Sequence, residues 1–156
     1  MVIGFGCDHV GVELKGVLMA RAAELGHECR DYGCGACERS DYPVYGFLVG
    51  QAVAAGECAL GVVVCGTGAG ISISANKVKG VRAVACSEPY TARMARMHND
   101  ANVLGVGARV VGSEVAKMIL EEFLTASPEG GRHAARVDMI REIETTGGLA
   151  AAREAR

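Results

Sequence analysis

The stretch at residues 61–77, GVVVCGTGAGISISANK, constrains the fold more than any other part of the chain. An apolar run ends at Cys65, and glycines then occupy every second position before a helix-like segment at residues 71–78. This order is typical of a buried strand that enters a tight turn and then the first turn of a helix. Backbone N–H groups at a helix start attract anions and favour the thiolate of a nearby cysteine. The glycines are Gly66, Gly68 and Gly70. The stretch therefore predicts a reactive thiol above an anion-binding loop.

Length and composition indicate one ordinary globular domain. A chain of 156 residues can bury about 70% of the surface that its unfolded form exposes. Hydrophobic residues make up 50% of the chain and charged residues 22%, which is usual for a soluble protein. Because we find neither an internal repeat nor a dividing linker, we expect a single domain over residues 1–156. Residues 146–156 lack an apolar stripe, and we expect them to form a frayed tail.

Net charge and cysteine content limit the kinds of partner that the protein can bind and the cell compartment in which we expect it. The net charge of −2 argues against a general nucleic-acid binder and against attraction to a membrane surface. The uncharged window at residues 58–76 contains four glycines, so we do not expect it to span a membrane. Seven cysteines, with no signal peptide visible, predict reduced thiols in the cytoplasm.

Strand-like and helix-like segments alternate along the chain. Helices are expected between the strands, with Ser87 and Ser113 as the N-caps of two of them. The expected strands are residues 2–6, 28–32, 60–65, 82–86 and 102–106. This alternation predicts an α/β three-layer sandwich with a five-stranded parallel sheet, of Rossmann-like type. Ligands of such folds bind at the carboxyl ends of the strands.

Two common site types fit the sequence poorly. The glycines after Cys65 do not have the G-x-G-x-x-G spacing of dinucleotide-binding loops, and no G-x-x-x-x-G-K-[ST] occurs. Cys34 and Cys37 form a C-x-x-C in a loop, but neither a second C-x-x-C nor a matching histidine pair completes a zinc site. We therefore interpret these two cysteines as incidental.

Other candidate residues follow strands or lie near helix ends. Asp8 and His9 follow the first strand, so they face Cys65 if strands one and three are neighbours. Arg132 and Arg136 lie one helical turn apart and suit a dianionic phosphate, although a solvated basic face is an equal alternative. Likewise, Cys65 could be a packing residue and His98 a helix cap.

Taken together, the motifs resemble a known family. The motifs, in order, are GCDH at 6–9, SDYP at 40–43, CGTG at 65–68, GIS at 70–72, ANK at 75–77, CSEPY at 86–90, HND at 98–100 and GGRH at 130–133. Over about residues 2–145 the chain resembles the type B ribose-5-phosphate isomerases. These belong to the sugar-phosphate isomerase family that includes allose- and galactose-6-phosphate isomerases.

The resemblance implies a fold, a reaction and an assembly. The implied strand order is 2-1-3-5-4, with a C-terminal helix used in dimerisation and active sites between the subunits of a homodimer or a dimer of dimers. The implied reaction interconverts ribose 5-phosphate and ribulose 5-phosphate through an enediolate, without a metal or cofactor. Two alternatives stay open: an isomerase of six-carbon sugar phosphates, and a flavodoxin-like module that binds phosphate without chemistry.

The resemblance also implies roles for single residues. Cys65 would move the proton between C2 and C1, since Ile71 stands where another branch of the family has a glutamate. Thr67 would assist the base, and His98 would help to open the furanose ring with Asp8 nearby. Backbone N–H groups would hold the enediolate oxygen together with Asn99; they belong to residues 66–72, including Gly66, Gly68, Gly70 and Ser72.

The remaining implied residues bind the substrate's ends. Asp41 and Tyr42 would line the sugar site. Phosphate would be bound by His9, Arg109, Arg132 and Arg136, some of them from the partner subunit. The departure from the family pattern is the pair of cysteines in the loop at residues 33–37, just ahead of Asp41, which leaves the fine substrate preference open.

Overall fold

A five-stranded parallel sheet forms the centre of the protein, seen in a computed structural model that describes residues 1–35 and 39–154. The strands are β1 (Val2–Cys7), β2 (Glu28–Asp31), β3 (Leu60–Cys65), β4 (Ala83–Ala85) and β5 (Val103–Gly107). Their order, β2-β1-β3-β5-β4, confirms the expected topology, including the neighbouring positions of β1 and β3. All five expected strands form, within one or two residues of the expected bounds.

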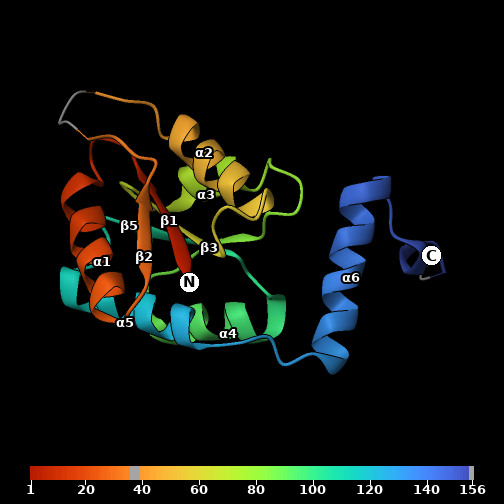
Figure 1. Cartoon of the computed structure of the whole chain (residues 1–156). Helices are drawn as coiled ribbons and strands as arrows, with labels where there is room; N and C mark the ends of the chain where they lie inside the picture. Colours follow the sequence, from red (N-terminus) through yellow and green to blue (C-terminus); the bar gives the residue numbers. More distant parts are fainter. Residues whose placement is uncertain (36–38, 155–156) are drawn as a thin grey trace.

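Helices cover both faces of the sheet (Figure 1). One face packs against α1 (Val12–Glu24), α4 (Pro89–Asn99) and α5 (Ser113–Thr125), and the other against α2 (Tyr42–Ala54) and α3 (Ala69–Ala75). Because side chains of a strand alternate between faces, Val62 and Val64 join the first core and Val63 and Cys65 the second. Cys65 therefore faces the layer of α2 and α3.

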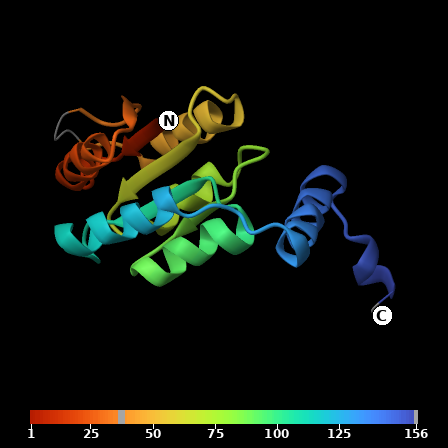
Figure 2. The ribbon, with the colours of Figure 1, turned by 60° about the horizontal axis from the view of Figure 1, so that its bottom comes forward.

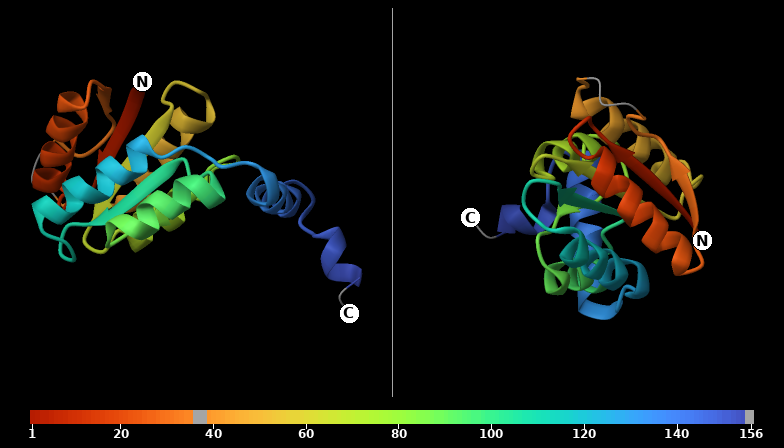
Figure 3. Two further views of the ribbon diagram at one scale, coloured as in Figure 1. Left: turned by 90° about the horizontal axis from the view of Figure 1, so that it is seen from below. Right: turned by 90° about the vertical axis from the view of Figure 1, so that its left-hand side faces the viewer.

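The C-terminal helix α6 (Gly131–Thr146) stands away from this sandwich (Figures 2 and 3). It packs chiefly on α4 and ends at Gly147, which has a left-handed φ of 69°. A short helix, α7 (Ala150–Glu154), follows where the sequence led us to expect a frayed tail. Among the described residues, no helix is both long and apolar enough to cross a membrane.

Two expected helix caps are wrong. The N-cap of α4 is Glu88, not Ser87, and its carboxylate accepts a hydrogen bond of 2.9 Å from the backbone N–H of Thr91. This bond lowers the pKa of Glu88. Helix α5 already includes Ser113, and its N-cap is Gly112, without a side-chain hydrogen bond. Glu88 takes the cap because Pro89 occupies the first helical position, which suits a residue without an N–H.

The glycine loop (residues 66–70) lies directly on the end of β5. A Cβ atom on Gly107 would come within 2.8 Å of the Thr67 backbone, and Gly68 itself has a φ of 77° close to Val106. At Gly105 a Cβ would overlap the hydroxyl of Ser72, which donates a hydrogen bond of 2.7 Å to the Gly68 carbonyl. The absence of side chains on this edge of β5 therefore sets the position of the loop.

We predict that Gly105→Ala destabilises the fold by about 1–3 kcal/mol, because the added methyl group collides with the Ser72 hydroxyl. The free energy of unfolding, from urea titration, measures this effect. Adding Ser72→Ala removes the colliding oxygen, so the double variant should regain most of the loss.

The matched control is Gly16→Ala, at a position in α1 where a Cβ meets nothing within 4 Å. That variant should be neutral or slightly more stable than wild type. Wild-type stability of Gly105→Ala, or a double variant no better than the single one, would contradict the packing described here.

Candidate active site

Cys65 is the last residue of β3 and lies at the carboxyl edge of the sheet, where the parallel strands end. Its side chain is 4% exposed and packs in the same core as Ile71 of α3. The Cys65 carbonyl accepts a hydrogen bond of 2.8 Å from the Ala108 N–H, and the Gly66 carbonyl accepts one of 3.0 Å from the Arg109 N–H. These two backbone bonds hold the segment after β5 against the glycine loop, and they place the exposed Arg109 beside that loop.

The loop is held by its own hydroxyl groups. Thr67 is exposed, and its Oγ1 accepts a hydrogen bond of 3.3 Å from the Ala69 N–H. Ser72 is buried, and both its hydroxyl and its backbone N–H donate to the Gly68 carbonyl, at 2.7 and 3.3 Å. Ser72 therefore shapes the loop, whereas the resemblance implied that its N–H would bind an anion.

Asp8 and His9 lie next to this loop because β1 pairs with β3. The Asp8 N–H donates to the Val64 carbonyl at 3.2 Å, and the buried Asp8 carboxylate accepts from the N–H groups of Val10 and Gly11 at 2.9 and 3.2 Å. The His9 N–H donates to the Ser40 hydroxyl at 3.0 Å. Asp8 therefore reaches the end of β3, and His9 is held against Ser40 in the segment before α2.

Tyr42 and Asp41 close this side of the loop. Asp41 is the exposed N-cap of α2, and its carboxylate makes no capping hydrogen bond. The Tyr42 ring lies against Gly70, where a Cβ atom would come within 2.7 Å of the ring. Gly70 thus lets an aromatic side chain cover the loop. Asp8, His9, Asp41, Tyr42, Cys65, Thr67 and Arg109 all gather at the carboxyl edge.

The remaining candidates lie at the opposite, amino edge. Helix α4 carries His98 and Asn99 at its end and is followed by β5. The start of β5 pairs Val103 with Gly61, whereas its end pairs Gly107 with Cys65, roughly 13 Å along the strands. One chain therefore does not bring His98 to Cys65 or Asp8.

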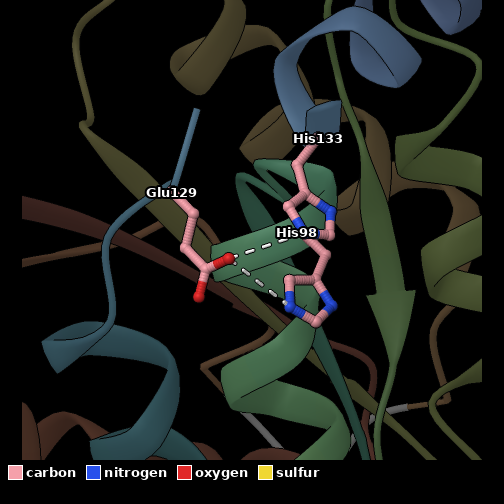
Figure 4. Close-up of side chains that lie close together, drawn as sticks. All are labelled: His98, Glu129 and His133. Atoms are coloured by element: carbon pink, nitrogen blue, oxygen red, sulfur yellow. Dashed lines mark ion pairs between the residues drawn. The ribbon is translucent and has the colours of Figure 1, made fainter. Parts of the chain in front are cut away.

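A second cluster surrounds His98 (Figure 4). The rings of His98 and His133 stack, with centroids 4.1 Å apart and planes 5° apart. Glu129 Oε2 lies 3.5 Å from His133 Nε2 and 3.9 Å from His98 Nε2. The chain before α6 is fastened to α4 by a 3.0 Å bond from the Glu129 N–H to the Met97 carbonyl. A cavity of about 80 Å³ adjoins both rings.

The surroundings of His133 lower its pKa, although Glu129 acts in the opposite direction. Desolvation lowers its pKa from the ordinary value, and the nearby His98 and Arg132 lower it further. Arg132 Nε also donates to His133 Nε2 at 3.3 Å, a bond that requires an unprotonated nitrogen. In this arrangement His133 Nε2 is the acceptor of the bond from Arg132.

The cluster contains side chains that could coordinate a metal, but the arginines beside it carry the positive charge that is typical of an anion-binding site. Ligand atoms of His98, Glu129 and His133 lie within 4.8 Å of one another. Arg132, however, already bonds to the nitrogen that a metal would take, and the exposed Arg136 adds a second positive charge to the same helix. This arrangement suits a phosphate better than a cation.

Sequence reasoning missed Glu129 as part of this cluster. Glu129 lies before α6, whose N-cap is Gly130, so no helical spacing in the sequence pairs it with His133. Glu129 comes close to His98 only because α4 packs on α6, and the sequence does not show this packing.

Other cysteines differ from Cys65 in their surroundings. Burial raises the pKa of Cys7 and of Cys86 to about 11, so both remain protonated at neutral pH. The Cys34 carbonyl accepts from Lys15 Nζ at 3.3 Å. Cys37, the other half of the C-x-x-C, lies outside the described residues.

Comparisons with known proteins identify relatives of this chain. A relative from Escherichia coli (strain K12), ribose-5-phosphate isomerase B, is 56% identical over 142 residues, which cover 91% of this chain and 95% of the relative. The galactose-6-phosphate isomerase subunit LacB of Clostridium acetobutylicum is 43% identical over 126 residues, covering 81% of this chain and 73% of that protein.

A solved structure and a family model point the same way. The structure of Clostridium thermocellum ribose-5-phosphate isomerase B has a TM-score of 0.92 and 49% identity, covering 95% of this chain and 100% of that chain. Residues 3–140 match the model of the Ribose/Galactose Isomerase family. With a sheet order, a glycine loop and sequence matches that all agree, the chain belongs to the ribose/galactose isomerase family.

Proposed function

We propose that this protein interconverts D-ribose 5-phosphate and D-ribulose 5-phosphate, with Cys65 as the base and without a metal or cofactor. The observation that carries the proposal is the position of the Cys65 thiol, at the end of β3 and directly before the glycine loop, with Thr67 next to it. The near full-length similarity to a ribose-5-phosphate isomerase B supports the choice of substrate.

The residues account for each proton. His98 assists ring opening, because only the open aldehyde has an acidic proton on C2. Cys65 then removes that proton as a thiolate, and the loop N–H groups with Asn99 stabilise the charge that develops on the enediolate oxygen. The thiol, whose proton exchanges with solvent, then delivers a proton from sulfur to C1, and the hydroxyl proton moves from O2 to O1, so no net oxidation occurs.

The substrate's phosphate supplies much of the binding energy that orients C1 and C2 against the base. We assign it to Arg132 and Arg136, with His9 and Arg109, while Asp41 and Tyr42 contact the sugar. Since these groups lie at opposite edges of one chain, the complete site requires two copies. His98, Asn99, Arg132 and Arg136 then come from the partner subunit.

Helix α6 offers a surface for this second copy. Its apolar residues Met139, Ile140 and Ile143 are 38%, 43% and 48% exposed. Ile140 and Ile143 line a groove of about 480 Å³ together with Asn99, one of the residues that must meet the partner. Burying this groove in a homodimer, or a dimer of dimers, would cover apolar surface and complete two sites at once.

We place the protein in the cytoplasm, where its thiols stay reduced and a small phosphorylated sugar is retained. A six-carbon sugar phosphate is the second candidate substrate, favoured by the similarity to a galactose-6-phosphate isomerase subunit.

Cys65→Ala should lower the turnover of ribose 5-phosphate by at least about 10²-fold, because it removes the base. The matched control is Cys86→Ala, which removes an equally buried thiol that follows β4. Steady-state rates in both directions measure the effect. Near wild-type turnover of Cys65→Ala would exclude this thiol as the base.

Ribose 5-phosphate should be used at least about tenfold more efficiently, by kcat/KM, than allose 6-phosphate or galactose 6-phosphate. The reason is that an added carbon lengthens the distance between the phosphate and C2 of the sugar, whereas the protein fixes the distance between the arginines and the thiol. Assaying the three sugars with one preparation decides the matter, and a preference for either hexose phosphate would favour the second candidate.

Mixing inactive variants should restore activity if two chains build each site. Cys65→Ala and His98→Ala, unfolded together in urea and refolded in equal amounts, should give about a quarter of the wild-type activity, since half of the dimers then have one intact site of two. The control mixes wild type with the double variant, which should also give about a quarter.

A site contained within one chain predicts a different pair of values. The first mixture would then show no activity, and the control would retain about half. The two mixtures together therefore separate a shared site from an unshared one.

A further inference from the structure

Asp100 ends α4 in an unusual backbone conformation. Its φ of 46° and ψ of 43° are left-handed, and among the described residues it is the only non-glycine with a positive φ. This conformation costs an ordinary residue roughly 1–2 kcal/mol, and aspartate tolerates it better than most. Strained residues persist where their surroundings over-determine them, which is common near functional sites.

Three guanidinium groups surround the Asp100 carboxylate. Its Oδ2 lies 2.7 Å from Arg82 Nη2, and its Oδ1 lies 2.9 Å from Arg96 Nη1. Arg141 of α6 is the third, with Nη2 at 3.8 Å from Oδ2. Arg82 precedes β4, so one carboxylate joins β4, α4 and α6.

The same arginines also hold the backbone around Asp100. Arg82 Nε donates to the carbonyls of Asn99 and Asp100 at 3.1 and 2.9 Å. Arg96 Nη1 donates to the Ala101 carbonyl at 2.7 Å, and its guanidinium carbon lies 5.8 Å from the centroid of the Phe123 ring. Arg82 and Arg96 are only 16% and 12% exposed, so these charges are poorly screened by solvent.

Asp100 therefore lies between α4, which carries His98, and α6, which carries His133. His98 lies two positions before it on α4, and the ring of His98 stacks on His133 of α6. Helix α6 otherwise stands away from the sandwich (Figure 1). The Asp100–Arg141 pair is thus a second tie between α4 and the helix against which His98 is stacked.

We propose that Asp100 is a positioning residue for ring opening: its carboxylate holds the end of α4 against α6 and so fixes the orientation of His98. This inference rests on the proposed isomerase function and on the role given there to His98. The long arginine side chains of α6 can adjust to a small displacement, whereas a stacked imidazole must keep its direction to transfer a proton.

Two variants distinguish the effect of the Asp100 carboxylate from the effect of its backbone conformation. Asp100→Asn keeps the size and the tolerance for a left-handed φ but removes the charge. Asp100→Gly removes the side chain and relieves all backbone strain. The matched control is Glu121→Gln, which breaks a 2.7 Å ion pair with Arg21 between α1 and α5, outside the proposed site.

Two reactions serve as readouts. Ribose 5-phosphate must open its ring, whereas ribulose 5-phosphate is already open, because its O5 carries the phosphate and cannot close a furanose. We expect both Asp100 variants to lower ribose 5-phosphate turnover about tenfold. Solvent deuterium exchange at C1 of ribulose 5-phosphate should fall less than about threefold, and Glu121→Gln should change neither rate by more than about twofold. Circular dichroism at the assay temperature verifies that each variant is folded.

Three results would overturn the inference. Equal losses in both reactions would indicate a general loss of structure. Wild-type turnover of Asp100→Gly would show that ring opening does not need the Asp100 side chain. Wild-type turnover of Asp100→Asn would show that ring opening does not need the charge of the carboxylate.

Assaying His98→Ala in parallel distinguishes a failure of the inference about Asp100 from a failure of the proposed function. If His98→Ala shows no selective loss of ribose 5-phosphate turnover, the ring-opening role of His98 is wrong whatever Asp100 does. If His98→Ala shows that loss and the Asp100 variants do not, only the inference about Asp100 fails.

Discussion

The close contact between the glycine loop and the bare end of β5 is the constraint on which the rest of the site depends. Gly105 and Gly107 carry no side chains, so Ser72 and the backbone of Thr67 can lie directly on that strand. The Ser72 hydroxyl then holds the Gly68 carbonyl, and the Cys65 carbonyl is tied to the segment after β5. The result is a thiol at a strand end beside a loop whose shape is fixed before any substrate binds. Such preorganisation is what stabilisation of a developing oxyanion requires.

The parallel sheet divides the functional groups between its two edges. The candidate residues that follow β1, β3 and β5 lie near Cys65, whereas those at the end of α4 and the start of α6 lie near His98. The proposed base, Cys65, and the proposed phosphate-binding residues Arg132 and Arg136 are thereby kept apart within one chain by the length of the strands. In the proposed dimer a second copy brings the two groups together, and the exposed apolar residues of α6 are the surface that we propose for its binding.

Much of this arrangement could be predicted from the sequence. The alternation of apolar runs with helix patterns predicts the layers, and the glycines after Cys65 predict the turn, because both signals are local. The strand order came from the resemblance to a family and was confirmed. The inward direction of the Ser72 hydroxyl could not be predicted, since it depends on Gly105, which is distant in sequence and adjacent only in the folded sheet. The same holds for Glu129, whose place beside His98 depends on how α6 packs on α4. The caps at Ser87 and Ser113 failed for a local reason: a helix can begin one residue away from the most favourable side chain.

The central claim is that this chain moves a proton between two carbons of a sugar phosphate. Incubation of ribose 5-phosphate with the wild-type protein in D₂O, followed by NMR, tests it most directly. We predict that ribulose 5-phosphate forms with deuterium at C1 and that the recovered ribose 5-phosphate carries deuterium at C2. Recovery of ribose 5-phosphate alone, without deuterium at C2, would contradict the account and leave a protein that binds the sugar without acting on it.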